Sequence, residues 1–149
     1  LYYGSEVGMA GDQNLGDANI RKDFPGGWDN DENNAFNPET RTECQSAYFD
    51  FTSKLFNWRK TNEAVHFGKT THYIPENNVY VYFRYNTTKT VMVIINNHPE
   101  IQTLNPDRFQ ENILNYKTGK EVLNNVKFDL SQTIAIEGKS ALILELEKN

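Results

Sequence analysis

The 149-residue sequence contains a single cysteine, Cys44, so no disulfide can form within the chain. A disulfide-stapled scaffold is excluded, although the cellular compartment is not settled by this. Long hydrophobic runs are also missing, because the longest, Val91 to Ile95, is far shorter than the roughly 20 residues that span a bilayer. There is no cluster of Lys or Arg, and the net charge is −5. We therefore expect neither a membrane nor a nucleic acid as partner, since nucleic-acid binding normally uses a basic patch.

What is present suits a folded protein. Hydrophobic residues make up 38% of the chain, aromatic residues 13%, and charged residues of both signs 23%. This composition can build a core and argues against disorder. The length allows one ordinary domain or parts of two. The sequence begins at Leu1 rather than at Met and shows no signal peptide, so we expect that preceding residues have been removed.

Glycine is concentrated in residues 1–40, which hold six of the nine glycines with many Asn and Asp residues between them. This texture predicts a long loop after a very short strand at Leu1–Tyr3. Loops of this length are usually functional or disordered. Because this loop contains Phe24, Trp28 and Phe36, we expect an ordered, functional loop.

A helix is predicted next. Asn37-Pro38-Glu39-Thr40 is a favourable helix start, with Pro in the first turn and Glu near the positive helix end. An apolar stripe at steps of four and three follows over about four turns: Cys44, Tyr48, Phe51, Leu55 and Trp58. We expect this stripe to pack on the C-terminal domain or on a second copy of the chain, as a homodimer, because exposing it to water is costly. In the alternative, residues 1–35 are largely mobile.

From about Lys69 the hydrophobic period changes to two, which is typical of strands. Strands are predicted at 79–85, 91–95, 113–116, 120–123, 126–130, 132–137 and 140–147. Breaks are predicted at Thr118-Gly119 and Gly138-Lys139, and a helical turn at Asn105–Phe109. Val91 to Ile95 is expected to be buried on both faces. Short strands with regular turns predict an antiparallel sandwich.

The opening residues carry a resemblance to a known family. Leu1-Tyr2-Tyr3-Gly4-Ser5-Glu6 resembles the last barrel strand and following turn of the α-amylase family of glycoside hydrolases. Asp17-Ala18-Asn19-Ile20-Arg21 is similar to the family's loop in which an Asp precedes an Arg by four residues, although Ala18 stands where the family usually has Pro. Asp23–Trp28 resembles the neopullulanase and cyclomaltodextrinase branch.

This resemblance implies an α+β fragment. Residues 1–68 would form the last strand, active-face loop and last helix of an incomplete (β/α)₈ barrel, and residues 69–149 an eight-stranded antiparallel β-sandwich C-terminal domain. The parent enzyme would hydrolyse α-glucosidic bonds of starch, pullulan or cyclodextrins. The family's catalytic carboxylates precede Leu1, so the resemblance implies no catalytic residue in this chain and no activity by the chain alone. It implies a periplasmic or extracellular location, with a cytoplasmic one as the alternative.

Two residues are predicted to bind substrate. By resemblance, Asp17 and Arg21 line the sugar-binding cleft, where carboxylate and guanidinium groups can each make paired hydrogen bonds to hydroxyls. Loops after barrel strands build the active face of such a barrel. The alternative, that Asp17 and Arg21 pair with each other to stiffen the loop, is compatible with this role. Trp28 is left open between lining the cleft and packing within the loop.

Other chemistry is not predicted. Retaining glycoside hydrolysis needs two carboxyl groups about 5–5.5 Å apart, and the acidic residues of the loop are more simply explained as solvated. His66, His72 and His98 are scattered, with no Ser–His–Asp signature. We expect no cofactor and no metal: an EF-hand starting at Asp29–Asn34 would have Asn and Thr where it needs Gly and Glu. A looser calcium site at this segment is an alternative.

Two further functions belong to other classes. The sandwich would be a carbohydrate-binding module if tyrosines on its strands stack on sugars, the candidates being Tyr73, Tyr80, Tyr82 and Tyr85. An exposed, coplanar pair of these rings would favour that function. A pure interaction domain is the third hypothesis, and no specific residue supports it.

Overall fold

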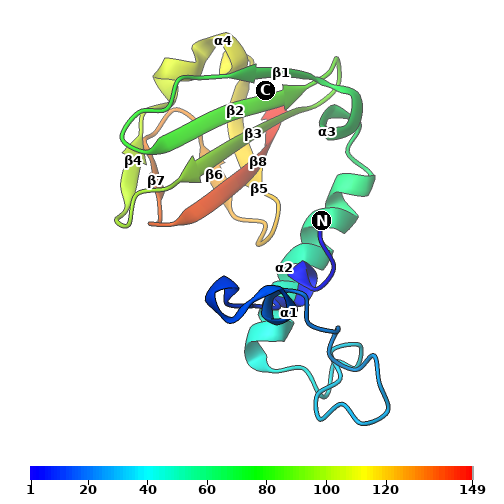
Figure 1. The fold of residues 1–149 in the computed structure, drawn as a ribbon. Coiled ribbons are helices and arrows are strands. Elements are labelled where there is room, and N and C mark those ends of the chain that lie inside the picture. The colour runs from blue at the N-terminus through cyan, green and yellow to red at the C-terminus, as the bar shows by residue number, and fades with distance from the viewer. Residues whose placement is uncertain (149) are drawn as a thin grey trace. The chain divides into compact units, whose positions relative to one another are not determined.

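The computed structural model describes residues 1–148. It divides into two compact units, Leu1–Asn57 and a second that begins at Trp58. Figure 1 shows short helical pieces and one long helix in the first unit, and a β-rich second unit. Helix α2 (Glu43–Lys60) carries the chain across the boundary between the units. The predicted boundary between residues 68 and 69 stays a prediction.

The first unit contains no strand among its described residues, so the strand predicted at Leu1–Tyr3 is wrong. The chain instead turns at once into the 3₁₀ helix η1 (Ser5–Val7), as the Ser5 amide donates to the Tyr2 carbonyl at 3.2 Å. The physical reason is that a lone strand has no neighbour for its N–H and C=O groups. The barrel end implied by the resemblance is therefore not evident. Two further short helices, η2 (Gln13–Leu15) and α1 (Asp17–Ile20), complete the loop.

Helix α2 begins later than predicted. The Asn37-Pro38-Glu39-Thr40 segment forms turns, with the Asn37 side chain accepting from the Glu39 amide at 3.1 Å. The helix starts after Thr42, whose Oγ1 accepts from the Gln45 amide at 3.2 Å while Gln45 Oε1 accepts from the Thr42 amide at 2.9 Å. This reciprocal capping box, Thr-x-x-Gln, satisfies two donors that a helix end otherwise leaves free.

The apolar stripe of α2 is not buried. Helix α2 has no buried residue, and the side chains of Tyr48 and Phe51 are each 50% exposed. The expectation that this stripe packs on the C-terminal domain or on a second copy stays a prediction.

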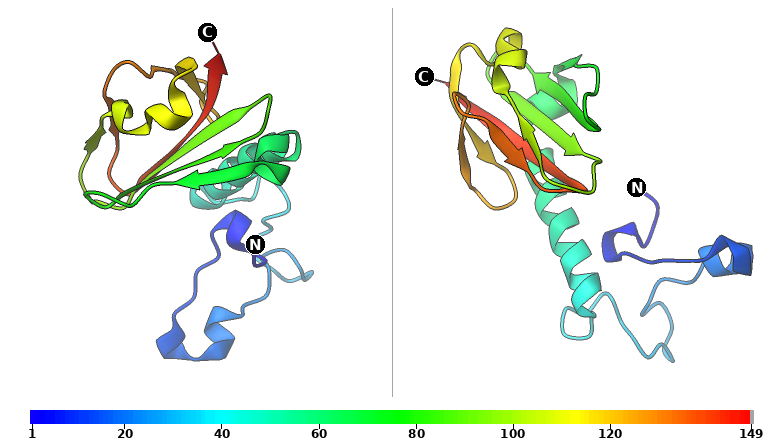
Figure 2. Two further views of the ribbon diagram at one scale, coloured as in Figure 1. Left: turned by 90° about the horizontal axis from the view of Figure 1, so that it is seen from above. Right: turned by 90° about the vertical axis from the view of Figure 1, so that its left-hand side faces the viewer.

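The second unit starts with helix α3 (Glu63–Phe67) and continues with eight strands, all in antiparallel pairs. Their bounds are β1 (Lys69–His72), β2 (Val79–Tyr85), β3 (Thr90–Asn96), β4 (Gln102–Leu104), β5 (Tyr116–Glu121), β6 (Lys127–Asp129), β7 (Ile134–Ile136) and β8 (Ser140–Lys148). Six strands form one sheet in the order β1-β2-β3-β8-β5-β6, and β4 pairs with β7, as labelled in Figure 1. Figure 2 shows these strands from two further sides. The eight-stranded antiparallel domain expected from the resemblance is confirmed. The short strands β1 and β4 were not anticipated as separate strands.

Period-two alternation builds the core. Val79, Val81 and Phe83 are buried and their neighbours in β2 are only half-buried, as predicted. In β3, Val91 to Ile94 are all buried, which confirms burial on both faces, whereas Ile95 is 39% exposed. The core cluster joins the inner residues of β2 and β3 to those of β4, β7 and β8, and its members include Met92, Ile94, Leu104, Ile134, Ile136, Leu144 and Leu146.

One predicted strand and one predicted break are corrected. The strand predicted at 113–116 is wrong except for its last residue, which begins β5, because the predicted helical turn, η3 (Pro106–Phe109), leads into helix α4 (Gln110–Ile113). Phe109 and Ile113, four residues apart, are both buried in the core, and a helix places such positions on one face. The predicted break at Thr118-Gly119 is also wrong, because β5 runs through it. A Cβ on Gly119 would lie only 3.1 Å from the Cβ of Leu144, so this glycine serves close packing rather than a turn.

Asn96 is a buried polar residue of the second unit whose side chain has several partners, whereas the indole Nε1 of Trp58 is buried without one among residues 1–148. The Asn96 side chain, 1% exposed, donates from Nδ2 to the carbonyls of Glu100, Ile136 and Glu137 at 2.9–3.1 Å and accepts from the His98 amide at 2.8 Å. It therefore ties β3 to the β7–β8 connection. Among the helices of residues 1–148, none combines the length and hydropathy needed to cross a bilayer.

Candidate functional site

The predicted substrate-binding residues lie on a loop closed by its own hydrogen bonds. The Tyr3 hydroxyl donates to the Lys22 carbonyl at 3.0 Å, and Lys22 Nζ donates to the Ala10 carbonyl at 3.2 Å. Loss of surrounding water raises the pKa of the Tyr3 phenol, and the neighbouring Tyr2 adds to the rise. The phenol therefore keeps the proton that it donates. These contacts fasten both ends of the segment from residue 3 to residue 22.

Asp12 and Asn19 fix the middle of this loop. The Asn19 side-chain oxygen accepts from the Asp12 amide at 2.7 Å, and Asp12 Oδ1 caps η2 by accepting from the Asn14 amide at 2.9 Å. Gly11 permits the close approach, because a Cβ there would lie 2.7 Å from the Cα of Ile20. Sequence inspection missed this network, although Asp-x-Asn after a glycine is a recognisable Asx-turn signal.

Asp17 and Arg21 are brought together at opposite ends of α1. Arg21 Nη1 lies 3.3 Å from Asp17 Oδ2, and the two side chains are 64% and 71% exposed. The predicted mutual pairing is thus present, at the one-turn spacing at which helix side chains meet. An exposed pair of this kind contributes little to stability. Within residues 1–148 the other Asp17 carboxylate oxygen makes no hydrogen bond, so it is available to a ligand hydroxyl. Their contact with substrate stays a prediction.

A second turn presents Trp28. The Asp31 carboxylate accepts from the amides of Gly26 and Trp28 at 2.8 and 3.1 Å and so caps this turn. The indole Nε1 of Trp28 donates to Asp23 Oδ2 at 3.2 Å, while the side chain stays 67% exposed. Trp28 is therefore held at its polar edge but not buried in the loop. The cleft-lining role is the alternative that this exposure favours.

Three acidic residues of the loop are engaged in these local contacts: Asp17 with Arg21, Asp23 with Trp28, and Asp31 with two amides. In the described part of the chain, no three His, Cys, Asp or Glu side chains gather where they could hold a metal ion. The looser calcium site at Asp29–Asn34 has no support from this geometry.

The three histidines make structural contacts. The His66 ring nitrogen Nε2 lies 2.8 Å from the Arg59 carbonyl, and His98 Nδ1 accepts from the Glu100 amide at 3.1 Å. The His72 ring meets the edge of Tyr80. None of them lies beside a nucleophile and a carboxylate in the arrangement that acyl transfer requires.

The tyrosines of the sandwich do not form a flat sugar platform. The rings of Tyr80 and Tyr82 lie 5.7 Å apart but are inclined by 32°, and both side chains are half-buried. Burial raises the pKa of Tyr82. Tyr73 is held by its hydroxyl, which donates to Asn112 Oδ1 at 2.8 Å, and its ring packs at right angles on Phe109. The coplanar exposed pair that would mark a carbohydrate-binding face is not present among these residues.

Comparison with known families identifies the second unit. The family described as the cyclo-malto-dextrinase C-terminal domain matches residues 70–145, which is just over half of the chain. The matched segment runs from the second residue of β1 into β8 and so includes residues of all eight strands.

Solved structures of α-amylase-family enzymes share the fold. An α-amylase from Geobacillus thermoleovorans, complexed with acarbose, has a TM-score of 0.68 at 18% identity and covers 99% of this chain and 29% of its own. A debranching enzyme from Nostoc punctiforme, soaked with acarbose, has a TM-score of 0.62 at 20% identity and covers 97% and 25%. AmyP in complex with maltose has a TM-score of 0.63 at 15% identity and covers 72% and 22%. The present chain thus spans less than a third of the length of these structures.

Proposed function

Because the chain belongs to the cyclomaltodextrinase C-terminal domain family, we propose that it is the non-catalytic C-terminal part of a glycoside hydrolase. The parent enzyme hydrolyses α-glucosidic bonds of starch, pullulan or cyclodextrins. The observation that carries this proposal is the family match, which includes residues of all eight strands. The coverage of 97–99% of the chain by two α-amylase-family structures supports extending it to residues before the match.

Catalysis is assigned to residues outside this chain. A retaining mechanism needs a nucleophile and a general acid/base on two carboxyl groups about 5–5.5 Å apart. The three best-placed loop acids, Asp17, Asp23 and Asp31, are each engaged with a cation, an indole N–H or backbone amides. Such contacts suit a scaffold rather than a reacting pair. The catalytic carboxylates are proposed to lie upstream of Leu1, on a (β/α)₈ barrel of which this chain supplies the last loop and helix.

The Asp17–Arg21 pair is proposed to contact substrate in that parent. The pair is exposed, and its loop is held by hydrogen bonds that Tyr3 and Lys22 donate and that the Asn19 side chain accepts from the Asp12 amide. A carboxylate and a guanidinium side by side offer acceptors and donors to neighbouring sugar hydroxyls. Pre-ordering the loop lowers the entropy lost on binding.

The sandwich is proposed to cover one side of the barrel and to stabilise the parent. On the face of the six-stranded sheet that points away from the core, the central strands β2, β3 and β8 carry a group of apolar side chains: Tyr80, Tyr82, Val93, Ile95 and Ile143. Helix α3 covers part of this face, as Asn62 Nδ2 donates to Glu145 Oε1 at 2.7 Å and Arg84 donates to the Val65 carbonyl at 2.8 Å. The remaining apolar surface suits a packing partner.

Hydrolysis of pullulan and cyclodextrins tests the proposal. The purified 149-residue chain is compared with the same chain extended N-terminally through a full barrel. Activity only in the extended protein is the expected result. Hydrolysis by the short chain would mean that the acidic loop contains a catalytic pair and would refute the non-catalytic assignment.

Two expectations accompany this function as proposals. The parent enzyme is placed in the periplasm or outside the cell, and cell fractionation tests this against a cytoplasmic location. The exposed stripe of α2, which includes Tyr48 and Phe51, is proposed to pack in the parent or to join two copies of the isolated chain. Analytical sedimentation of the isolated chain and of its Phe51→Ser variant measures whether two copies associate through this stripe.

A further inference from the structure

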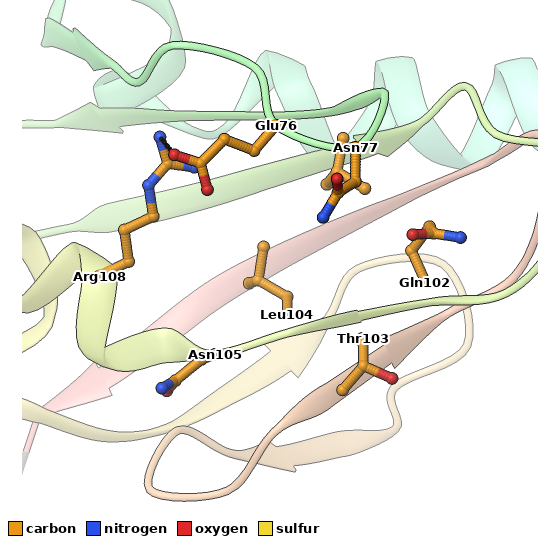
Figure 3. A pocket seen from close by; sticks show the side chains of 8 residues that line it. Glu76, Asn77, Gln102, Thr103, Leu104, Asn105 and Arg108 are labelled. Carbon is orange, nitrogen blue, oxygen red and sulfur yellow. Dashed lines mark ion pairs between the residues drawn. The ribbon is translucent and has the colours of Figure 1, made fainter.

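A small concavity in the second unit has the chemistry of a ligand site. It lies between the turn that leads into β2 and strand β4, and its volume is about 240 Å³. Figure 3 shows Leu104 and Gln102 on the side of β4 that faces Asn77, with Glu76 and Arg108 beside them. Small-molecule sites usually measure roughly 300–1,000 Å³. The concavity therefore suits one small ring rather than a long ligand.

The turn that forms one wall is rigid. Asn77 and Asn78 have φ angles of 49° and 60°, and the Glu76 and Val79 backbones exchange hydrogen bonds of 2.8 and 3.1 Å. This is the two-residue hairpin with two left-handed residues, for which Asn and Gly are the preferred residues. The turn thus fixes the Asn77 backbone, from which the side-chain amide extends beside the concavity.

The opposite corner is fixed by Arg108. Its Nη2 lies 2.8 Å from Glu76 Oε1 and donates to the Ile74 carbonyl at 2.8 Å. The guanidinium and the carboxylate neutralise each other, so the site has no net charge from its ion pair. A strongly ionic ligand would find no uncompensated charge to bind.

Hydrogen-bonding capacity remains unused around this frame. Among residues 1–148, the Asn77 side chain makes no hydrogen bond, and Gln102 uses only its Nε2, on the Ile101 carbonyl. Planar amides, a carboxylate and a guanidinium offer donors and acceptors at fixed spacing. Val79 and Leu104 supply an apolar surface below them. Neutral polar groups above an apolar floor match a sugar ring, which carries hydroxyls at its rim and C–H groups on its face.

We propose that this concavity binds one glucose unit of a neutral α-glucan, at a surface site separate from the Asp17–Arg21 loop. The choice of an α-glucan over other neutral sugars rests on the proposed function, whereas the choice of a neutral sugar rests on the concavity itself. No aromatic ring lines the site, so stacking adds nothing and the affinity is weak. The site would hold the polymer near the parent enzyme rather than select the bond to be cut.

Backbone amide shifts on titration with maltotriose test this. With the ¹⁵N-labelled 149-residue chain, we expect saturable shifts at residues 76–79 and 102–108. Asn77→Gly keeps the left-handed turn but removes the amide, and Gln102→Ala removes the second amide. Each variant is expected to weaken binding by about 5- to 10-fold, the loss of roughly one hydrogen bond. The unfolding temperature of each variant is expected to stay near that of the unsubstituted 149-residue chain.

Matched controls keep the test decisive. Phe67→Ala alters the separate exposed surface beside Tyr85 and is expected to leave maltotriose binding unchanged. Absence of saturable shifts at the concavity, or unchanged affinity in both amide variants, would overturn the inference. Hydrolysis by the barrel-extended chain is scored separately. Intact hydrolysis without binding here refutes only this site, and binding here without hydrolysis refutes only the proposed function.

Discussion

Different interactions stabilise each of the two units of this chain. Of the buried apolar side chains in residues 1–148, only Val7 and Ala35 belong to the first unit, and all the others lie in the second. The first unit relies on hydrogen bonds such as those of Tyr3, Asp12 and Asp31. Hydrogen bonds of this kind contribute only about 0.5–1.5 kcal/mol each, whereas burial of one large side chain contributes about 1.5–3 kcal/mol.

This difference predicts that stability depends mainly on the second unit and that the first unit contributes exposed side chains. A sandwich with a continuous core supplies its own stability, and its surface is free to cover or bind something else. A loop with almost no core holds exposed functional groups and gains little stability from them. We therefore expect substitutions in the second unit to alter unfolding, and substitutions in the first to alter substrate use by the parent enzyme.

The largest effect is expected from the centre of the sandwich. Phe83 is 0% exposed and contacts the Tyr73 and Phe109 rings, so Phe83→Ala should lower the unfolding free energy by about 3–5 kcal/mol. Denaturant unfolding measures this. The matched substitution in the first unit, Phe36→Ala, removes a side chain that is 64% exposed and should cost less than about 1 kcal/mol. Equal losses at both positions would contradict the contrast between the units.

Removal of the Asn96 side chain comes next. Asn96→Ala leaves three carbonyls and one amide of the β3 and β7–β8 connections without their partner, and should cost about 3 kcal/mol. Asn115→Ala, at an exposed position with no side-chain hydrogen bond among the described contacts, is the control and should change stability by less than about 0.5 kcal/mol. If both variants have the same unfolding free energy, the hydrogen bonds of the Asn96 side chain are not a source of stability.

Sequence patterns predicted the second unit better than the first for the same physical reason. The alternation in Val79–Tyr85 and the apolar run from Val91 indicate which side chains are buried, and the pattern of burial determines the fold of a sandwich. The strand at Leu1–Tyr3 failed because pairing depends on neighbours that a local pattern does not contain. The late start of α2 was readable as the Thr42 capping box, whereas the pairing of Gly119 with strands on both sides was visible only in three dimensions. The Asp17–Arg21 pairing was one of the alternatives open from the sequence, whereas the concavity beside Asn77 is formed by two segments, 76–79 and 102–108, that are distant in the sequence.

A methyl group at Gly119 tests how tightly the core of the second unit is packed. Its Cβ would lie 3.1–3.3 Å from the side chains of Leu144 and Leu146, which must shift slightly. Gly119→Ala should therefore cost about 1–2 kcal/mol through overpacking. Thermal unfolding followed by near-ultraviolet circular dichroism measures both the loss and any loosening of the core. A stabilised variant would show that the sheet has room there and that the glycine serves another purpose.

A smaller effect is expected from acid. Hydrogen bonds from Lys127 and Thr118 lower the pKa of the Glu147 carboxyl below its ordinary 4.5. Because the folded pKa is depressed, this stabilisation is complete above pH 4.5 and is lost as the pH falls through the folded value. Glu147→Gln should accordingly lower the unfolding temperature slightly at pH 7, where this stabilisation is present, and the difference from the unsubstituted chain should disappear as the pH falls below about 4.5. Asp129, whose pKa is lowered by hydrogen bonds from Ser131, is the comparison site in the same sheet.

The smallest effect on stability is expected where the effect on function is largest. Asp17→Ala removes an ion pair whose side chains are 64% and 71% exposed, so the unfolding free energy should change by less than about 0.5 kcal/mol. In the barrel-extended protein, the proposed role of Asp17 as a charged hydrogen-bonding contact to substrate predicts that the same change lowers kcat/KM by roughly 10- to 100-fold. Asp29→Ala, in the same acidic loop, is the control and should leave kcat/KM within a factor of two or so. Because stability and activity are measured on matched variants, an Asp17 variant that unfolds early but hydrolyses normally would reverse the assignment of the two units.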